Sequence, residues 1–127
     1  MRYGYMVYGG TVVAAVLFQY AVEHYLPFRP FGGSWSVLPW TIHIFAYAVL
    51  GAIAWRALRA HSLVPRVTLL SLVGILPHLV PELAGQTDPA YPHIGLVFII
   101  PDLLCVALGA GIARALDTRV SASKPSG

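Results

Sequence analysis

Charged residues are scarce in this chain of 127 residues: only 10% are Asp, Glu, Lys or Arg, while 57% are hydrophobic. A soluble globular domain carries about 25% charged residues, so this chain lacks the polar surface that would keep it in water. Its net charge is +3, but there is no basic, aromatic-interleaved patch of the kind that binds nucleic acid. We therefore expect the lipid bilayer as a partner, and no nucleic acid.

Cysteine is almost absent as well. Cys105 is the single cysteine, which excludes an intrachain disulfide and a CxxC redox or zinc motif. Its apolar neighbours are typical of a small buried hydrophobic residue. The HExxH pattern of zinc proteases is also missing. Any chemistry must therefore come from residues that are scattered along the chain.

Long apolar runs are what the chain does have. A membrane helix needs about 20 mostly apolar residues, and four segments qualify: residues 4–25, 35–59, 64–83 and 91–116. Pro65 falls in the first turn of the third segment, where proline is tolerated, and Pro101 should kink the fourth. The sequence predicts an all-α integral membrane protein, with a four-transmembrane-helix bundle at residues 1–119 and a polar, flexible tail at 120–127.

Basic residues gather on one side of this predicted bundle. They occupy the N-terminus, the second loop and the C-terminal end: Arg2, Arg56, Arg59, Arg66, Arg114, Arg119 and Lys124. The first loop has only Arg29, and the third loop has no basic residue. Cytoplasmic loops are enriched in Lys and Arg, so we expect both termini to be cytoplasmic in a multi-pass protein of a prokaryotic cell membrane.

The two halves of the chain are similar in layout, which suggests two related helical hairpins. Each half has a helix that ends with an acid and a histidine, a proline-containing outer loop, and a helix that starts near a histidine. Small residues recur at every fourth position in the fourth segment and in part of the second: Cys105, Gly109 and Ala113; Ala107, Gly111 and Ala115; Ala48 and Ala52. This spacing lets helix backbones approach closely, within the bundle, a homo-oligomer or a larger membrane complex.

Histidines and acids gather toward the predicted outer side. The set is Glu23, His24, His43, His78, Glu82 and His93. His78 and Glu82 are four residues apart, which places them on one face of a helix. Imidazole and carboxylate groups together bind zinc, iron or copper, and imidazoles from two helices can ligate haem. We expect the whole set to supply metal ligands, or His43, His78 and His93 to bind a cofactor.

Asp102 stands apart from this set. It lies nine residues after His93, about 13 Å deeper in the bilayer at 1.5 Å per residue, and an ionisable residue at that depth is a functional hypothesis by default. On a straight helix the two residues face opposite ways, so either Pro101 re-aims the chain or they serve different contacts. Ser71 lies at a matching depth on the third segment and is a candidate hydrogen-bond partner for Asp102.

Three functions fit this pattern. The first is a small multi-pass membrane protein that binds a metal ion or haem near the outer face, as a subunit of a larger membrane complex. The second is an intramembrane acid–base enzyme of the isomerase or cyclase type, acting on a lipid or isoprenoid, with Glu82 or Asp102 as the acid and His78 as the partner base. The third is a structural or assembly subunit. The sequence leaves open whether the chain is an enzyme, and the predominance of histidine favours cofactor binding.

Overall fold

The structure is a computed structural model that describes residues 2–25, 37–85 and 94–123. Within these ranges the chain is helical with short turns and contains no strand. The helices are α1 (Arg2–Tyr25), α2 (Val37–Ala57), α3 (Leu63–Leu83), the single turn α4 (Ile94–Val97) and α5 (Ile99–Ser123). The prediction of an all-α fold built on four long helices is confirmed for this part of the chain.

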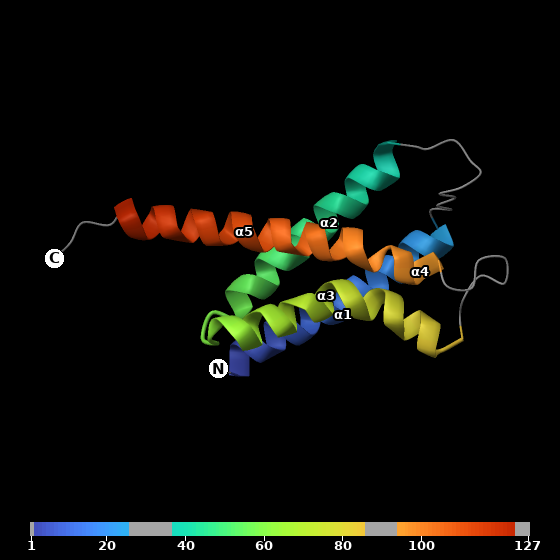
Figure 1. The fold of residues 1–127 in the computed structure, drawn as a ribbon, viewed down its shortest axis with the longest axis horizontal. Helices are drawn as coiled ribbons and strands as arrows, with labels where there is room; N and C mark the ends of the chain where they lie inside the picture. Colours follow the sequence, from blue (N-terminus) through green and yellow to red (C-terminus); the bar gives the residue numbers. More distant parts are fainter. Residues whose placement is uncertain (1, 26–36, 86–93, 124–127) are drawn as a thin grey trace.

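The four long helices pack as two pairs. α2 and α5 cross each other, while α1 and α3 run side by side (Figure 1). α1 also contacts α2, and α3 contacts α5, so the two pairs form one bundle. The start of α1, the α2–α3 turn and the end of α5 lie at the same end of the bundle (Figure 1). We call this the basic end, because Arg2, Arg56, Arg59, Arg66 and Arg119 belong to these segments.

Among the described residues, two helices are long and apolar enough to cross a membrane: α3 and the Ile99–Ser121 part of α5. In α2, the stretch Thr41–Ala57 is apolar but shorter. α1 does not meet the same criterion over its described residues, and its first half is rich in tyrosine and glycine. Length and composition therefore support two of the four predicted spans.

Prolines shape the helices in the predicted way. Pro65 is the third residue of α3, and the helix runs on through Pro77 and Pro81. The helix before Pro101 is interrupted at Phe98, between α4 and α5, because Pro101 has no N–H to donate to the preceding turn. At its other end α5 continues to Ser123, four residues into the segment that was predicted to be a tail.

The crossing of α2 and α5 depends on glycine. A Cβ atom on Gly109 would lie 1.8 Å from the carbonyl oxygen of Ala48, and one on Gly51 would lie 2.2 Å from the carbonyl oxygen of Val106. Any side chain at these positions would hold the two backbones apart. The predicted small-residue stripe through Gly109 therefore packs inside the bundle. The second stripe faces outward, and its members are Ala107, Gly111 and Ala115.

The interior is built largely from small and medium side chains. The buried apolar residues are Ala15, Tyr47, Ala54, Trp55, Leu58, Leu70, Val73, Val106, Ala110 and Ala113. In the part of the chain whose burial is described, four polar residues are buried with them: Thr11, Gln19, His78 and Asp102. Buried polar groups need partners, since each unsatisfied one costs free energy. The partners of Asp102 define the candidate site.

Candidate functional site

A carboxylate bridges two imidazoles at the contact between three helices. Asp102, in the first turn of α5, is 0% exposed. Its Oδ1 lies 2.5 Å from Nε2 of His43 on α2, and its Oδ2 is bonded to Nε2 of His78 on α3. We call these three residues the His–Asp–His centre.

Close helix packing explains why the three side chains meet. Asp102 lies four and seven residues before Val106 and Gly109, so it shares the face of α5 that crosses α2. α3 approaches α5 through Gly74, whose added Cβ would lie 3.2 Å from the backbone nitrogen of Leu103. His78 follows Gly74 by one turn of helix, which places its imidazole beside Asp102.

Hydrogen-bond chemistry assigns a direction to both contacts. An ionised carboxylate only accepts hydrogen bonds, so each histidine donates from Nε2–H to Asp102. In a neutral imidazole the other nitrogen, Nδ1, is then an acceptor. Nδ1 of His78 is buried and has no hydrogen-bond partner in the described part of the chain. Such an orphaned polar atom is uncommon inside proteins and often marks a functional site.

Aromatic residues hold the imidazole of His43 in place. Its ring centroid lies 4.8 Å from that of Tyr47 and 6.0 Å from that of Phe18. The Tyr47 hydroxyl, buried in the core, donates to Oε1 of Gln19 at 3.0 Å. Residues of α1 therefore support a centre whose three members come from α2, α3 and α5.

Two histidines of the predicted set are brought together, and Asp102 joins them. His43 and His78 meet through its carboxylate, whereas the sequence analysis kept Asp102 separate from the histidines. The expectation that Ser71 bonds Asp102 is wrong, because the Ser71 hydroxyl donates to the backbone oxygen of Val67. The helix is interrupted at Phe98, which agrees with the alternative that Pro101 re-aims the chain, while His93 lies outside the described residues.

The remaining predicted site residues are not assembled into this centre by the described contacts. Glu82 is partly buried in the last turn of α3, and Nε2 of His78 is bonded to Asp102. His93 and the side chains of Glu23 and His24 lie outside the described residues. Within the described ranges, no group of three or more His, Cys, Asp or Glu side chains is arranged to hold a metal ion. Metal binding stays a prediction.

Helical spacing placed Tyr47 and Gln19 on polar faces of their helices, but it did not predict their hydrogen bond or the bridging role of Asp102. Tyr47 follows His43 by four residues, so helical spacing alone places both on one face of α2. Asp102 is the only acidic residue within the apolar run of its helix between residues 94 and 116. A lone acid in one apolar segment and histidines in two others could have predicted this contact, because buried charges in membranes are usually paired.

No known protein-family model matches this chain, and no curated protein or solved structure matches it significantly. Functional inference therefore rests on the geometry of the centre and on the surface of the bundle.

Proposed function

We propose that this chain is a small multi-pass membrane protein whose His–Asp–His centre binds and releases a proton within the bilayer. It serves as a proton-transfer element of an oligomeric or larger membrane assembly. The observation that carries this proposal is the fully buried carboxylate of Asp102 between His43 and His78. Chains of Asp, Glu and His inside membranes are typical of proton pathways.

The outer surface of the bundle supports a bilayer as its solvent. On α5, apolar side chains at every fourth position are between 48% and 68% exposed: Ile100, Leu104, Leu108, Ile112 and Leu116. On α2, Phe45 is 71% exposed. A continuous exposed apolar face of this kind is unfavourable in water and suited to lipid. The arginines of the basic end favour a cytoplasmic location for that end and for both termini.

Counting charges supports a proton as the ligand. With two neutral imidazoles and an ionised Asp102, the buried centre has a charge of −1. One added proton turns an imidazole into an imidazolium and makes the net charge zero. An uncompensated buried charge is costly, and histidine is the side chain that most readily gains or loses a proton near neutral pH. The centre is therefore suited to hold one exchangeable proton.

The added proton is better placed on His43 than on His78. An imidazolium donates from both ring nitrogens, and Nδ1 of His78 has no acceptor among the described residues. An unpartnered neutral acceptor costs less than an unpartnered charged donor. The side chain of His43 is also 13% exposed, against 0% for His78. We expect His43 to be the imidazolium and His78 the neutral tautomer.

Burial makes lipid chemistry and haem binding less favoured here. Asp102 is 0% and His78 3% exposed, so the double bond of a lipid or isoprenoid has no access to these groups. Histidines that hold a haem would need Nε2 atoms free to ligate its iron. Here a single carboxylate joins those atoms.

Nitrogen-15 NMR of the reconstituted protein with labelled histidines tests the proposal. Of the two histidines in the centre, we expect one imidazolium, assigned to His43 by substitution, and rapid exchange of its N–H protons with deuterium from the solvent. Asp102→Asn should abolish the imidazolium, while Asp117→Asn, at an exposed aspartate on the same helix, should leave it intact. If His43 and His78 are both neutral in the native protein, or if their N–H protons fail to exchange over hours, the centre would have a purely structural role.

A metal ion is the second candidate, because the donor types suit one, although the described side chains are not arranged to hold it. Two imidazole Nε2 atoms and one carboxylate converge from three helices, and this combination suits iron, zinc or copper. The ion would replace the direct hydrogen bonds of Asp102. Elemental analysis and an absorption spectrum of the purified protein test this candidate. One metal ion per chain, lost in His78→Ala but retained in His61→Ala, would support it over the proton centre.

A further inference from the structure

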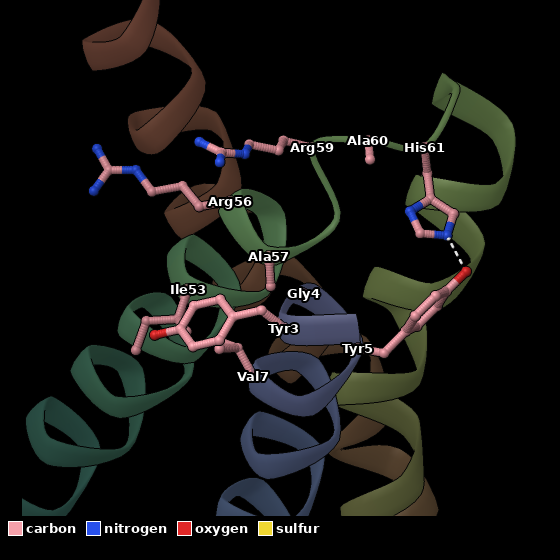
Figure 2. Close-up of a pocket in the computed structure, with 10 residues that line it drawn as sticks. All are labelled: Tyr3, Gly4, Tyr5, Val7, Ile53, Arg56, Ala57, Arg59, Ala60 and His61. Carbon is pink, nitrogen blue, oxygen red and sulfur yellow. Dashed lines mark hydrogen bonds between the residues drawn. The ribbon is translucent and has the colours of Figure 1, made fainter. Parts of the chain in front are cut away.

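A hollow of about 430 Å³ opens at the basic end, between the start of α1 and the α2–α3 turn. Figure 2 shows its lining side chains. Its wall is mostly apolar and includes Tyr3, Val7 and Ile53, while Arg56, Arg59 and His61 supply the polar part of the lining. The hollow therefore pairs a surface suited to hydrocarbon with a cationic edge, which is the chemistry of a lipid with an anionic headgroup.

The two arginines of this edge differ in their partners. The Arg56 guanidinium is bonded to Oδ1 of Asp117 at 3.1 Å. The Arg59 guanidinium has no ion-pair or hydrogen-bond partner in the part of the chain that the structure describes. Both side chains extend to the same side of the α2 terminus in Figure 2. Arg59 is thus a cationic hydrogen-bond donor without a partner among the described residues, beside Arg56, whose charge is partly neutralised by Asp117.

The remaining polar groups fix the shape of the hollow. The Tyr5 hydroxyl and Nε2 of His61 are 2.8 Å apart, so the α2–α3 turn is tied to the first turns of α1. Gly4 allows this approach, because a Cβ there would lie 2.6 Å from the carbonyl oxygen of Ala57. Nδ1 of His61 is buried without a partner among the described residues. The hollow is therefore built by specific contacts between two segments that are distant in the sequence.

We propose that this hollow binds the phosphate headgroup of an anionic glycerophospholipid. Arg59 would hold the phosphate, with Arg56 adding charge, and Tyr3 and Ile53 would contact the glycerol and upper acyl region. Basic pockets at the cytoplasmic side of membrane helices are suited to such headgroups. A free phosphate would use the arginines in the same way, but the apolar lining favours the lipid. The inference rests on the membrane location proposed above and is independent of the His–Asp–His centre.

Native mass spectrometry of the protein released from nanodiscs tests the site. The nanodiscs contain phosphatidylcholine alone or an equal mixture with phosphatidylglycerol. We expect the native protein to retain phosphatidylglycerol in preference to phosphatidylcholine. Arg59→Gln should lower that retention about fivefold, which is the weight of one basic side chain at an anionic membrane surface.

Arg119→Gln is the matched control, since it removes the same charge from an exposed arginine of α5 outside the hollow. Equal losses in both variants would show a diffuse charge effect and overturn the site. Equal retention of the two lipids by the native protein would also overturn the site. The same holds if inorganic phosphate displaces phosphatidylglycerol and Arg59→Gln retains as much phosphatidylglycerol as the native protein. A protein that is recovered only in water, without nanodisc insertion, would instead overturn the membrane location itself.

Discussion

The inner and outer faces of α5 carry the same residue types in opposite surroundings. Asp102 faces inward with 1% of its side chain exposed and bonds two histidines, whereas the side chain of Asp117 is 54% exposed and bonds Arg56. Gly109 presses against the backbone of Ala48, whereas Gly111 has nothing within 4 Å of an added Cβ. Within α5, Asp102 and Asp117, and likewise Gly109 and Gly111, are pairs of the same residue type that differ only in their surroundings.

Burial determines how much free energy a polar contact contributes to stability. Removing one partner of a buried charge pair costs about 3–5 kcal/mol, because the other partner stays buried without compensation. An exposed ion pair contributes about 0–1 kcal/mol, because water replaces the lost partner. Residue type alone does not distinguish Asp102 from Asp117.

The largest effect should come from removing the inner carboxylate. Asp102→Ala leaves the imidazoles of His43 and His78 without their shared acceptor, so we expect a loss of about 3–5 kcal/mol in unfolding free energy. Unfolding of the purified protein in mixed detergent micelles measures this loss. Asp117→Ala is the control and should cost less than about 1 kcal/mol. Equal losses in the two variants would contradict the assignment of Asp102 to the interior.

The next effect concerns the two glycines. Gly109→Ala should destabilise the bundle by about 1–3 kcal/mol, the usual range for overpacking, because its Cβ would meet backbone rather than a flexible side chain. Gly111→Ala should leave stability unchanged or raise it by up to about 1 kcal/mol, since alanine is the better helix former. The same unfolding measurement compares them. A destabilised Gly111→Ala with an unaffected Gly109→Ala would reverse the assignment of the two faces.

An effect in the same range is expected from a buried tyrosine hydroxyl, and a smaller one from an exposed tyrosine hydroxyl. Tyr47→Phe leaves the buried Oε1 of Gln19 without the donor seen at 3.0 Å, which should cost about 1–3 kcal/mol. Tyr5→Phe removes a hydroxyl from an exposed contact with His61, and should cost less than about 1 kcal/mol because water takes its place. Thermal unfolding of the two variants in one detergent tests the order. A larger loss of stability for Tyr5→Phe than for Tyr47→Phe would contradict the conclusion that burial determines the contribution of these hydroxyls.

The smallest effect should be the coupling between Arg56 and Asp117. A double-mutant cycle with Arg56→Gln and Asp117→Asn should give about 0.2–1 kcal/mol. Because both side chains are more than half exposed, raising the salt concentration should reduce this value. The cycle is measured at low and high salt. A coupling above this range that does not respond to salt would mean that the pair is shielded from solvent.

Much of the fold was predictable from hydropathy and from the positions of proline and glycine. Apolar runs located the four long helices, Pro101 marked the interruption at Phe98, and the four-residue spacing through Gly109 identified a packing stripe. Composition could not choose between the stripes through Gly109 and Gly111, because both consist of small residues at four-residue spacing. That choice depends on how α2 and α5 cross, which is a property of the assembled bundle.

The candidate site was predicted in part. Histidines in apolar segments pointed to His43 and His78, but their link through Asp102 joins residues 59 and 24 positions apart in the sequence. Helical phase describes one helix and says nothing about how separate helices rotate against each other. The break at Phe98 also means that a phase count along a straight helix does not extend across it to Asp102. Pairing a lone buried acid with nearby histidines by charge balance would have been the better rule.

The glycine contacts of the α2–α5 crossing also limit how the sequence can evolve. Gly51 faces the backbone of Val106 and Gly109 faces the backbone of Ala48, so neither glycine faces a side chain of the opposite helix. A substitution at one of them therefore cannot be rescued by shrinking a partner, because no side chain is there to shrink. We expect Gly51 and Gly109 to tolerate no substitution, while Gly111 on the same helix as Gly109 tolerates many. Deep mutational scanning would then reveal the crossing point as two isolated intolerant sites, without compensating pairs.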